Sequence, residues 1–153
     1  MKAITLGSTG ITTPQNAFGA LPVQRTDKQK AVKLLQRAYE GGITFFDTAR
    51  AYSDSEEKIG EALSDVRKNI FIATKTMAQN TEQMKSQLEM SLKTLKTDYI
   101  DIYQFHCAGQ CFRPDDGTGM YELMEDFKRQ GMIRHIGITA HKIGIAEESI
   151  ESG

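Results

Sequence analysis

The chain has 153 residues, of which 39% are hydrophobic and 25% are charged, and its net charge is -1. This composition excludes a chain that is disordered throughout, and the scattered lysines and arginines exclude a basic face for nucleic acid. The N-terminal stretch lacks the apolar core of a signal peptide, and no apolar run approaches the roughly 18 residues that cross a bilayer, so we expect a cytoplasmic protein.

The first part of the chain predicts a small appendage and a first strand. Turn formers at 7–10 and 13–14 separate short apolar pieces, which predicts a β-hairpin outside the main sheet. Residues 17–20 then predict a short strand. A length of this kind suits one domain, which can bury roughly 70% of its unfolded surface.

Helices are predicted wherever apolar residues recur three and four positions apart. The predicted helices cover residues 26–40, 53–66, 80–95, 120–130 and 141–153. The segments 26–29 and 53–56 each have a hydroxyl residue followed three positions later by Gln or Glu, the pattern of a capping box. Asn80 with Gln83 predicts the start of the third helix in the same way.

Four further strands are predicted between the helices, at residues 43–46, 70–76, 99–106 and 133–139. Polar side chains mark their ends, at Asp47, Lys75, His106 and Thr139, separated by 28, 31 and 33 positions. This distance is one strand–helix unit. Alternating units form a parallel sheet whose right-handed crossovers bring these strand ends to one edge. The period alone does not distinguish a doubly wound sheet from a (β/α)8 barrel.

The polar strand ends, together with a tyrosine in the adjoining turn, suggest acid–base chemistry on a carbonyl group. We expect the ammonium of Lys75 to lower the pKa of Tyr52 from its free value of about 10, and Asp47 to keep that lysine charged. His106 can then orient a carbonyl oxygen while Tyr52 protonates it. None of these side chains carries hydride, so a reduction implies a nicotinamide cofactor.

Several blocks in this order, FFDTARAY with SDSEEKIGEAL, IATKT, IYQFH and IRHIGITA, resemble the aldo-keto reductase family. The resemblance covers essentially the whole chain and implies an oxidoreductase that reduces aldehydes or ketones with NADPH or NADH. It places the family's catalytic tetrad on Asp47, Tyr52, Lys75 and His106, with Tyr52 as general acid. The segment FGALPVQR, at 18–25, is similar to a subgroup whose members often add a C-terminal iron-sulfur segment.

The implied fold is the N-terminal part of a (β/α)8 TIM barrel, an α/β fold of about five βα units preceded by a short β-hairpin. A complete barrel needs about 250 residues, so we expect residues 1–153 to form one incomplete barrel domain. The sequence contains neither GxGxxG nor GxxxxGK to cradle the cofactor's phosphates. The resemblance leaves a nicotinamide wall, predicted at Gly19, Ala20, Asp47 and Thr139, and we expect this chain alone to be inactive or weakly active.

Two departures from the family pattern concern the loops at the site. The usual Ser-Asn pair after the fifth strand is Thr139-Ala140, with His141 as a candidate substitute for the Asn. His106 is followed by Cys107-Ala-Gly in place of an apolar-proline loop, which affects the shape of the substrate pocket.

Alternatives from other classes remain at this stage. One is a non-catalytic fragment or regulatory module that keeps the barrel surface or the cofactor site. Another is a zinc site at His106, Cys107 and Cys111, which we disfavour because no fourth ligand follows at usable spacing. Unpaired edge strands would also promote self-association of the chain.

Overall fold

The computed structural model describes residues 2–152; Met1 and Gly153, the ends of the predicted domain and of the last predicted helix, lie outside the described residues. The strands are β1 (Ala3–Thr5), β2 (Thr12–Pro14), β3 (Phe18–Gly19), β4 (Phe45–Asp47), β5 (Phe71–Thr76), β6 (Ile100–Phe105) and β7 (Ile133–Ile138). The helices are α1 (Lys28–Glu40), α2 (Ser55–Leu63), α3 (Thr81–Leu95), α4 (Met120–Arg129) and α5 (Ile143–Glu151), with 3-10 helices η1 (Leu21–Arg25) and η2 (Ser64–Asn69).

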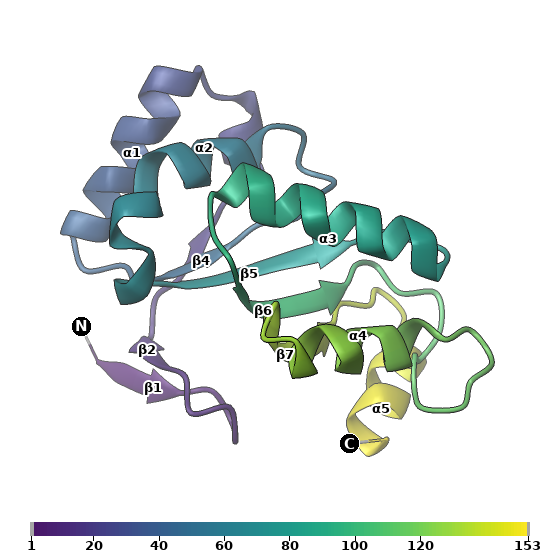
Figure 1. Cartoon of the computed structure of the whole chain (residues 1–153). Coiled ribbons are helices and arrows are strands. Elements are labelled where there is room, and N and C mark those ends of the chain that lie inside the picture. Colours follow the sequence, from purple (N-terminus) through teal and green to yellow (C-terminus); the bar gives the residue numbers. More distant parts are fainter. Residues whose placement is uncertain (1, 153) are drawn as a thin grey trace.

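The strands β3 to β7 form one parallel sheet in chain order, so each strand pairs with the next along the sequence. Helices α1 to α4 follow one another along one side of this sheet (Figure 1). The antiparallel β1–β2 hairpin is separate from it and lies near the start of β4, where the Thr13 and Thr44 hydroxyl oxygens are 3.3 Å apart. The predicted α/β fold with a preceding hairpin is therefore confirmed.

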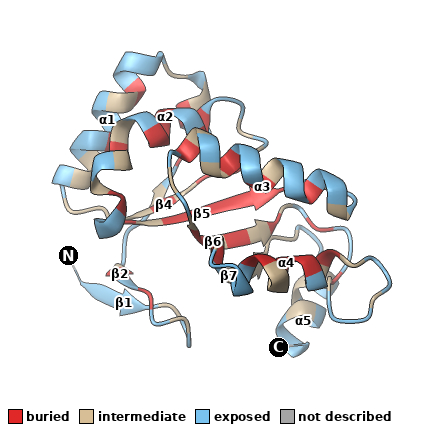
Figure 2. Ribbon diagram, viewed as in Figure 1, coloured by how far each residue is buried: buried red, intermediate tan, exposed pale blue. Residues whose placement is uncertain are grey.

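The core lies between the central strands and the helices, as the buried residues of β5, β6 and α3 show (Figure 2). Its fully buried side chains include Leu35, Phe46, Ile59, Ile72, Leu88 and Tyr103. Helix α5 contributes no buried residue, and Ile143 and Ile150 on it are 76% and 80% exposed. In the described part of the chain, β3 and β7 each pair on one side only. Self-association through these edges stays a prediction.

The helix starts differ from the predicted capping boxes. The side chain that caps α1 is Asp27, whose carboxylate accepts the Lys30 backbone N–H, so the cap lies one residue beyond Thr26. Helix α2 has Asp54 at its N-cap position and no side-chain cap bond, while Ser53 has a left-handed φ of 42°. Only the Asn80 start is confirmed, because its side chain accepts the Gln83 N–H. Both wrong assignments came from applying a spacing rule where another polar residue stood nearby.

A carboxylate ties three strands together at their amino ends. Asp101, which is fully buried, accepts hydrogen bonds from the Ile72 N–H on β5, from Arg67 and from Arg134 on β7. The two guanidinium groups each lie 4.0 Å from the centroid of the Tyr99 ring. The charge of this buried acid is therefore matched by two cations, as a buried carboxylate requires.

Helices α2 and α3 approach closely at Gly60. A β-carbon at this position would overlap the Thr94 carbonyl oxygen and lie 2.9 Å from the Leu95 backbone, neither of which is a flexible side chain. We expect Gly60→Ala to lower the free energy of unfolding by about 1–3 kcal/mol or more, measured by urea denaturation. The matched variant Gly144→Ala, where a β-carbon meets nothing within 4 Å, should be nearly neutral. Equal effects of the two would contradict this contact.

Candidate active site

The parallel sheet brings the predicted site residues to its carboxyl edge. Asp47 ends β4, Lys75 is the second-last residue of β5, and His106 directly follows β6. Their strands are neighbours, and the register pairs Asp47 with Ala73 and Lys75 with Gln104. Tyr52 lies in the loop between β4 and α2, which returns over this edge. The four residues that the sequence predicted are therefore placed together.

Asp47 and Lys75 form a close ion pair. The Lys75 ammonium is 2.5 Å from a carboxylate oxygen of Asp47 and also donates to the Thr48 carbonyl oxygen at 2.7 Å. Lys75 is 4% exposed, whereas the Asp47 side chain is 37% exposed. The charged amine is thus held in a fixed place beneath the edge, and one carboxylate side remains open to the surface.

Tyr52 contacts both the lysine and the histidine of the site. The Lys75 ammonium nitrogen lies 5.3 Å from the centroid of the Tyr52 ring. The rings of Tyr52 and His106 meet edge to face, with their centroids 5.6 Å apart and an angle of 82° between their planes. Each aromatic group therefore fixes the orientation of the other, as edge-to-face pairs do.

The pKa of Tyr52 moves in the direction opposite to the sequence prediction. Burial raises the pKa of the phenol above its ordinary value, and the ionised forms of Asp47 and Cys107 raise it further. The prediction that Lys75 lowers this pKa is wrong because burial of the phenol, together with the charges of Asp47 and Cys107, outweighs any effect of the ammonium. Tyr52 consequently remains protonated at neutral pH, as a proton donor must be.

His106 is held as a neutral imidazole. Burial lowers its pKa, the charges of Lys75 and His141 lower it further, and the Asp47 charge opposes them. Its Nδ1 atom is buried and has no hydrogen-bond partner in the part of the chain that the structure describes. A buried ring nitrogen without a partner costs stability, which is a cost that functional sites carry more often than structural ones.

We expect the His106 imidazole to titrate below the usual value of about 6.5. Since the unfolded chain then binds the proton more readily than the folded chain, acidification below this value should lower the free energy of unfolding. A ¹H–¹⁵N NMR titration of the three histidines, with the His106→Gln spectrum for assignment, measures this pKa. A His106 midpoint at or above the ordinary value would contradict the burial argument.

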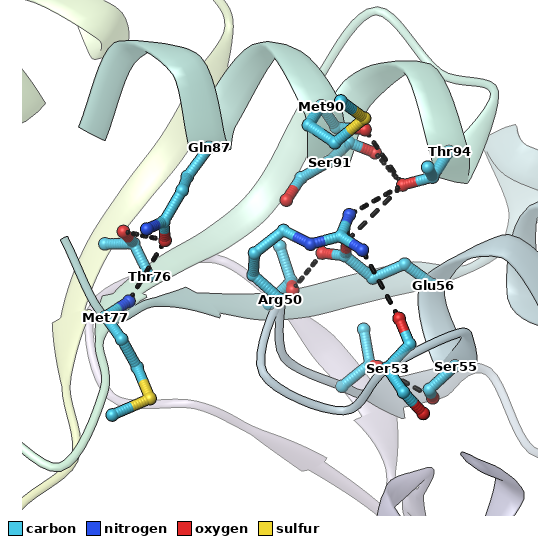
Figure 3. A network of polar contacts seen from close by, with 12 residues as sticks. Arg50, Ser53, Ser55, Glu56, Thr76, Met77, Gln87, Met90, Ser91 and Thr94 are labelled. Atoms are coloured by element: carbon cyan, nitrogen blue, oxygen red, sulfur yellow. Dashed lines mark hydrogen bonds and ion pairs between the residues drawn. The ribbon is translucent and has the colours of Figure 1, made fainter. Parts of the chain in front are cut away.

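The loop that carries Tyr52 is anchored by a buried network that the sequence prediction missed (Figure 3). The Arg50 guanidinium pairs with Glu56, which is fully buried, and also donates to the Ser53 carbonyl oxygen at 3.3 Å. Thr74 on β5 donates to the other Glu56 oxygen at 2.6 Å. The sequence pattern predicts Glu56 in a capping box, whereas its carboxylate is buried in this network. Its position three before Ile59 and seven before Leu63, on the apolar stripe of α2, was the signal that it is buried.

A hollow of about 420 Å³ opens beside the site, over the loops that follow β5 and β6. It is lined by Thr76, Met77, Ala78, Gln79, Phe105, His106, Cys107, Ala108, Gly109, Gln110, Phe112 and Thr118. Of the four predicted catalytic residues, His106 lines it. A molecule in this hollow therefore has access to the imidazole.

The residues predicted to border a cofactor differ in accessibility. Gly19 is exposed beside Asp47 in the register, and a β-carbon on it would meet nothing within 4 Å, which leaves room for a flat ring. Ala20 is fully buried, and its N–H donates to the Asp47 carbonyl oxygen, so it acts only through the shape of the loop. The Thr139 hydroxyl accepts the Cys107 N–H at 2.9 Å. Open space above Gly19 and one open side of the Asp47 carboxylate thus lie at this edge, which Thr139 also borders.

The cysteines are both free, and they have different surroundings. Cys107 is exposed and its sulfur lies 3.4 Å from Nε2 of His141, whereas Cys111 is buried. Among residues 2–152, no three His, Cys, Asp or Glu side chains are placed to hold a metal ion. The zinc alternative therefore finds no support, and His141, the candidate substitute for the family's Asn, contacts a thiol.

A parallel sheet whose strands pair in chain order, with helices following one another along one side, is the arrangement of a (β/α) barrel. The family model described as "Aldo/keto reductase family" matches residues 3–151. The chain belongs to this family.

Curated relatives include an uncharacterized oxidoreductase, YqkF, of Bacillus subtilis, which is 31% identical over 99% of this chain and 53% of its own length. The methylglyoxal reductase DkgA of Escherichia coli O157:H7 is 31% identical over 88% of this chain and 48% of its own length. The chain spans about half the length of the curated relatives it matches. The iron-sulfur subgroup and the domain extent stay predictions.

Solved structures agree with the barrel-type fold. The holo form of the aldo-keto reductase AKR11C1 from Bacillus halodurans has a TM-score of 0.84 at 30% identity, covering 100% of this chain and 55% of that one. An aldo-keto reductase from Klebsiella pneumoniae in complex with NADPH has a TM-score of 0.83 at 25% identity, covering 100% and 55%. The predicted part of a (β/α)8 barrel is confirmed. None of the helices in the described part of the chain combines the length and apolar character that crossing a membrane requires.

Proposed function

We propose that this chain carries the acid–base centre of an NAD(P)H-dependent reductase of aldehydes and ketones. The observation that supports this most strongly is the juxtaposition at one sheet edge of the Asp47–Lys75 ion pair, the Tyr52 ring and the neutral His106. Family membership supports the same reaction class. NADP-bound and NADPH-bound relatives support the nicotinamide cofactor.

Each residue has a separate part in this proposal. The carbonyl oxygen of the substrate accepts hydrogen bonds from the Tyr52 hydroxyl and from the His106 imidazole, which hold the carbonyl group and polarise it. The phenol then gives its proton to that oxygen as negative charge develops there. The Lys75 ammonium, kept in place by Asp47 and the Thr48 carbonyl oxygen, lies 5.3 Å from the centroid of the Tyr52 ring and helps to hold the phenol in position.

The cofactor supplies the hydride when it is bound. Gly19, Asp47 and Thr139 would border its nicotinamide ring, and the buried Ala20, whose N–H donates to the Asp47 carbonyl oxygen, would keep Gly19 beside Asp47. The fit rests on the open space above Gly19 and on the partly exposed carboxylate of Asp47.

The test is a titration of NADPH with the chain, followed by its fluorescence, and an assay of aldehyde reduction. Methylglyoxal is a suitable first substrate, since several relatives are named methylglyoxal reductases. A fluorescence change together with aldehyde-dependent oxidation of NADPH supports the proposal. Cofactor binding without turnover, or neither, would favour the alternative of a binding module. The predicted cytoplasmic location is not tested by this experiment.

A further inference from the structure

A cysteine and a histidine outside the proposed catalytic set face each other at the mouth of the site. The sulfur of Cys107 and Nε2 of His141 are 3.4 Å apart, and both residues are exposed. They come from different loops, after β6 and after β7, so the sheet topology brings them together. A thiol within reach of an imidazole nitrogen is the arrangement that produces a nucleophilic thiolate.

The backbone holds the thiol in this place. The Cys107 N–H donates to the Thr139 hydroxyl and the Ala108 N–H donates to the Thr139 carbonyl oxygen, so the two loops are joined just beside the pair. Cys107 has a φ of 50°, a left-handed conformation that residues other than glycine seldom adopt. The loop is further fixed by Phe112, which stacks on Phe105 with ring centroids 4.2 Å apart.

Cys107 also lines the hollow of about 420 Å³ described above, next to His106. The ionised form of Cys107 raises the pKa of Tyr52, and the charge of His141 lowers that of His106, so both members of the pair lie within electrostatic range of the proposed catalytic residues. A molecule bound in the hollow therefore meets a sulfur nucleophile beside the groups that would bind its carbonyl oxygen.

We infer that the Cys107–His141 pair is a covalent capture site for α,β-unsaturated aldehydes and ketones that enter this hollow. His141 takes the proton of the thiol, and the thiolate sulfur bonds to the β-carbon of the unsaturated compound. The carbon–carbon π electrons move toward the carbonyl to form an enolate, and the proton held by His141 returns to the α-carbon. The S–H group is thus added across the double bond, and no oxidant or reductant takes part.

The inference predicts selectivity between the two cysteines of one molecule. Cys111 is 7% exposed, its sulfur lies 3.6 Å from the Ser152 hydroxyl, and it does not line this hollow. It is the shielded thiol of the same chain, so its reaction rate gives the lower reference for Cys107. The adduct does not depend on the proposed reductase activity, so mass measurement without NADPH separates a failure of this inference from a failure of that function.

The experiment exposes the whole chain to 2-cyclohexen-1-one at neutral pH and follows adduct formation by intact mass and peptide mapping. We expect one adduct, on Cys107, and a rate roughly tenfold lower in His141→Gln, because this variant lacks the imidazole nitrogen 3.4 Å from the sulfur that takes the thiol proton. Tyr52 lies within electrostatic range of Cys107, and His106 lies within range of His141; both are unchanged in this variant.

The variant Lys142→Gln, next to His141 and exposed, is the matched control and should react like the original chain. Modification of Cys107 and Cys111 at similar rates would overturn the inference. So would a Cys107 rate that is unchanged in His141→Gln. Because peptide mapping is done on the original chain, the selectivity test holds even where a variant folds poorly.

Discussion

Replacing Tyr52 with phenylalanine should lower the rate of carbonyl reduction by about 10²–10⁴-fold, the usual contribution of a positioned general acid. The substitution removes one hydroxyl and keeps the ring that lies 5.6 Å from the His106 ring and 5.3 Å from the Lys75 ammonium. The geometry of the remaining residues should therefore persist. NADPH affinity should change little, since the phenol acts on the substrate oxygen.

The matched control for Tyr52→Phe is Tyr121→Phe on α4, which removes a hydroxyl away from the four proposed catalytic residues and should leave the rate unchanged. A second readout is the pH profile. Since burial raises the pKa of Tyr52, reduction should hold through neutral pH and fall only as the pH rises past the ordinary phenol value of about 10. A Tyr52→Phe protein with undiminished turnover would remove Tyr52 from the mechanism.

The second large effect is expected at Glu56, the fully buried acid beneath the Tyr52 loop. Glu56→Ala leaves the Arg50 cation without its partner and the Thr74 hydroxyl without its acceptor. Breaking a buried pair in this way should lower the free energy of unfolding by about 3–5 kcal/mol. Urea denaturation measures this loss, and activity should fall as well, because Arg50 also holds the Ser53 carbonyl oxygen beside Tyr52.

The adjacent residue provides the control. Glu57 is 53% exposed and pairs with Lys28 at the surface, so Glu57→Ala should change stability little. If both alanine variants unfold at the same urea concentration, the network around Glu56 does not stabilise the fold as argued.

The fold could be predicted because its signals are periodic. The stripe of Met84, Leu88, Leu92 and Leu95, together with Asn80 as its cap, gave both the existence and the start of α3. The polar residues Asp47, Lys75 and His106 at successive strand ends predicted that these residues meet at one edge of a parallel sheet. The predicted cap of α1 was wrong because Thr26 and Asp27 can both cap a helix. The sequence does not indicate whether the Thr26 hydroxyl or the Asp27 carboxylate accepts the free backbone N–H.

The site could be predicted as a set of residues but not as a set of charges. Spacing placed Lys75 near Tyr52, yet the sign of the shift in the Tyr52 pKa depends first on burial of the phenol and then on the charges of Asp47 and Cys107. The pairing of Cys107 with His141 depends on two loops 34 residues apart. Such contacts arise from loop conformation, which follows no sequence period.

The cluster in which Asp101 joins Ile72, Arg67 and Arg134 lies at the opposite ends of the strands from the proposed catalytic residues. The residues that hold the strands together therefore lie at the amino ends, and the proposed catalytic residues lie at the carboxyl ends of the same strands. Loops at the carboxyl edge can therefore change in length or composition without disturbing the Asp101 cluster. That cluster would still hold the strands in register. A fold of this kind can accept changes in the loops that contact a substrate with little loss of stability.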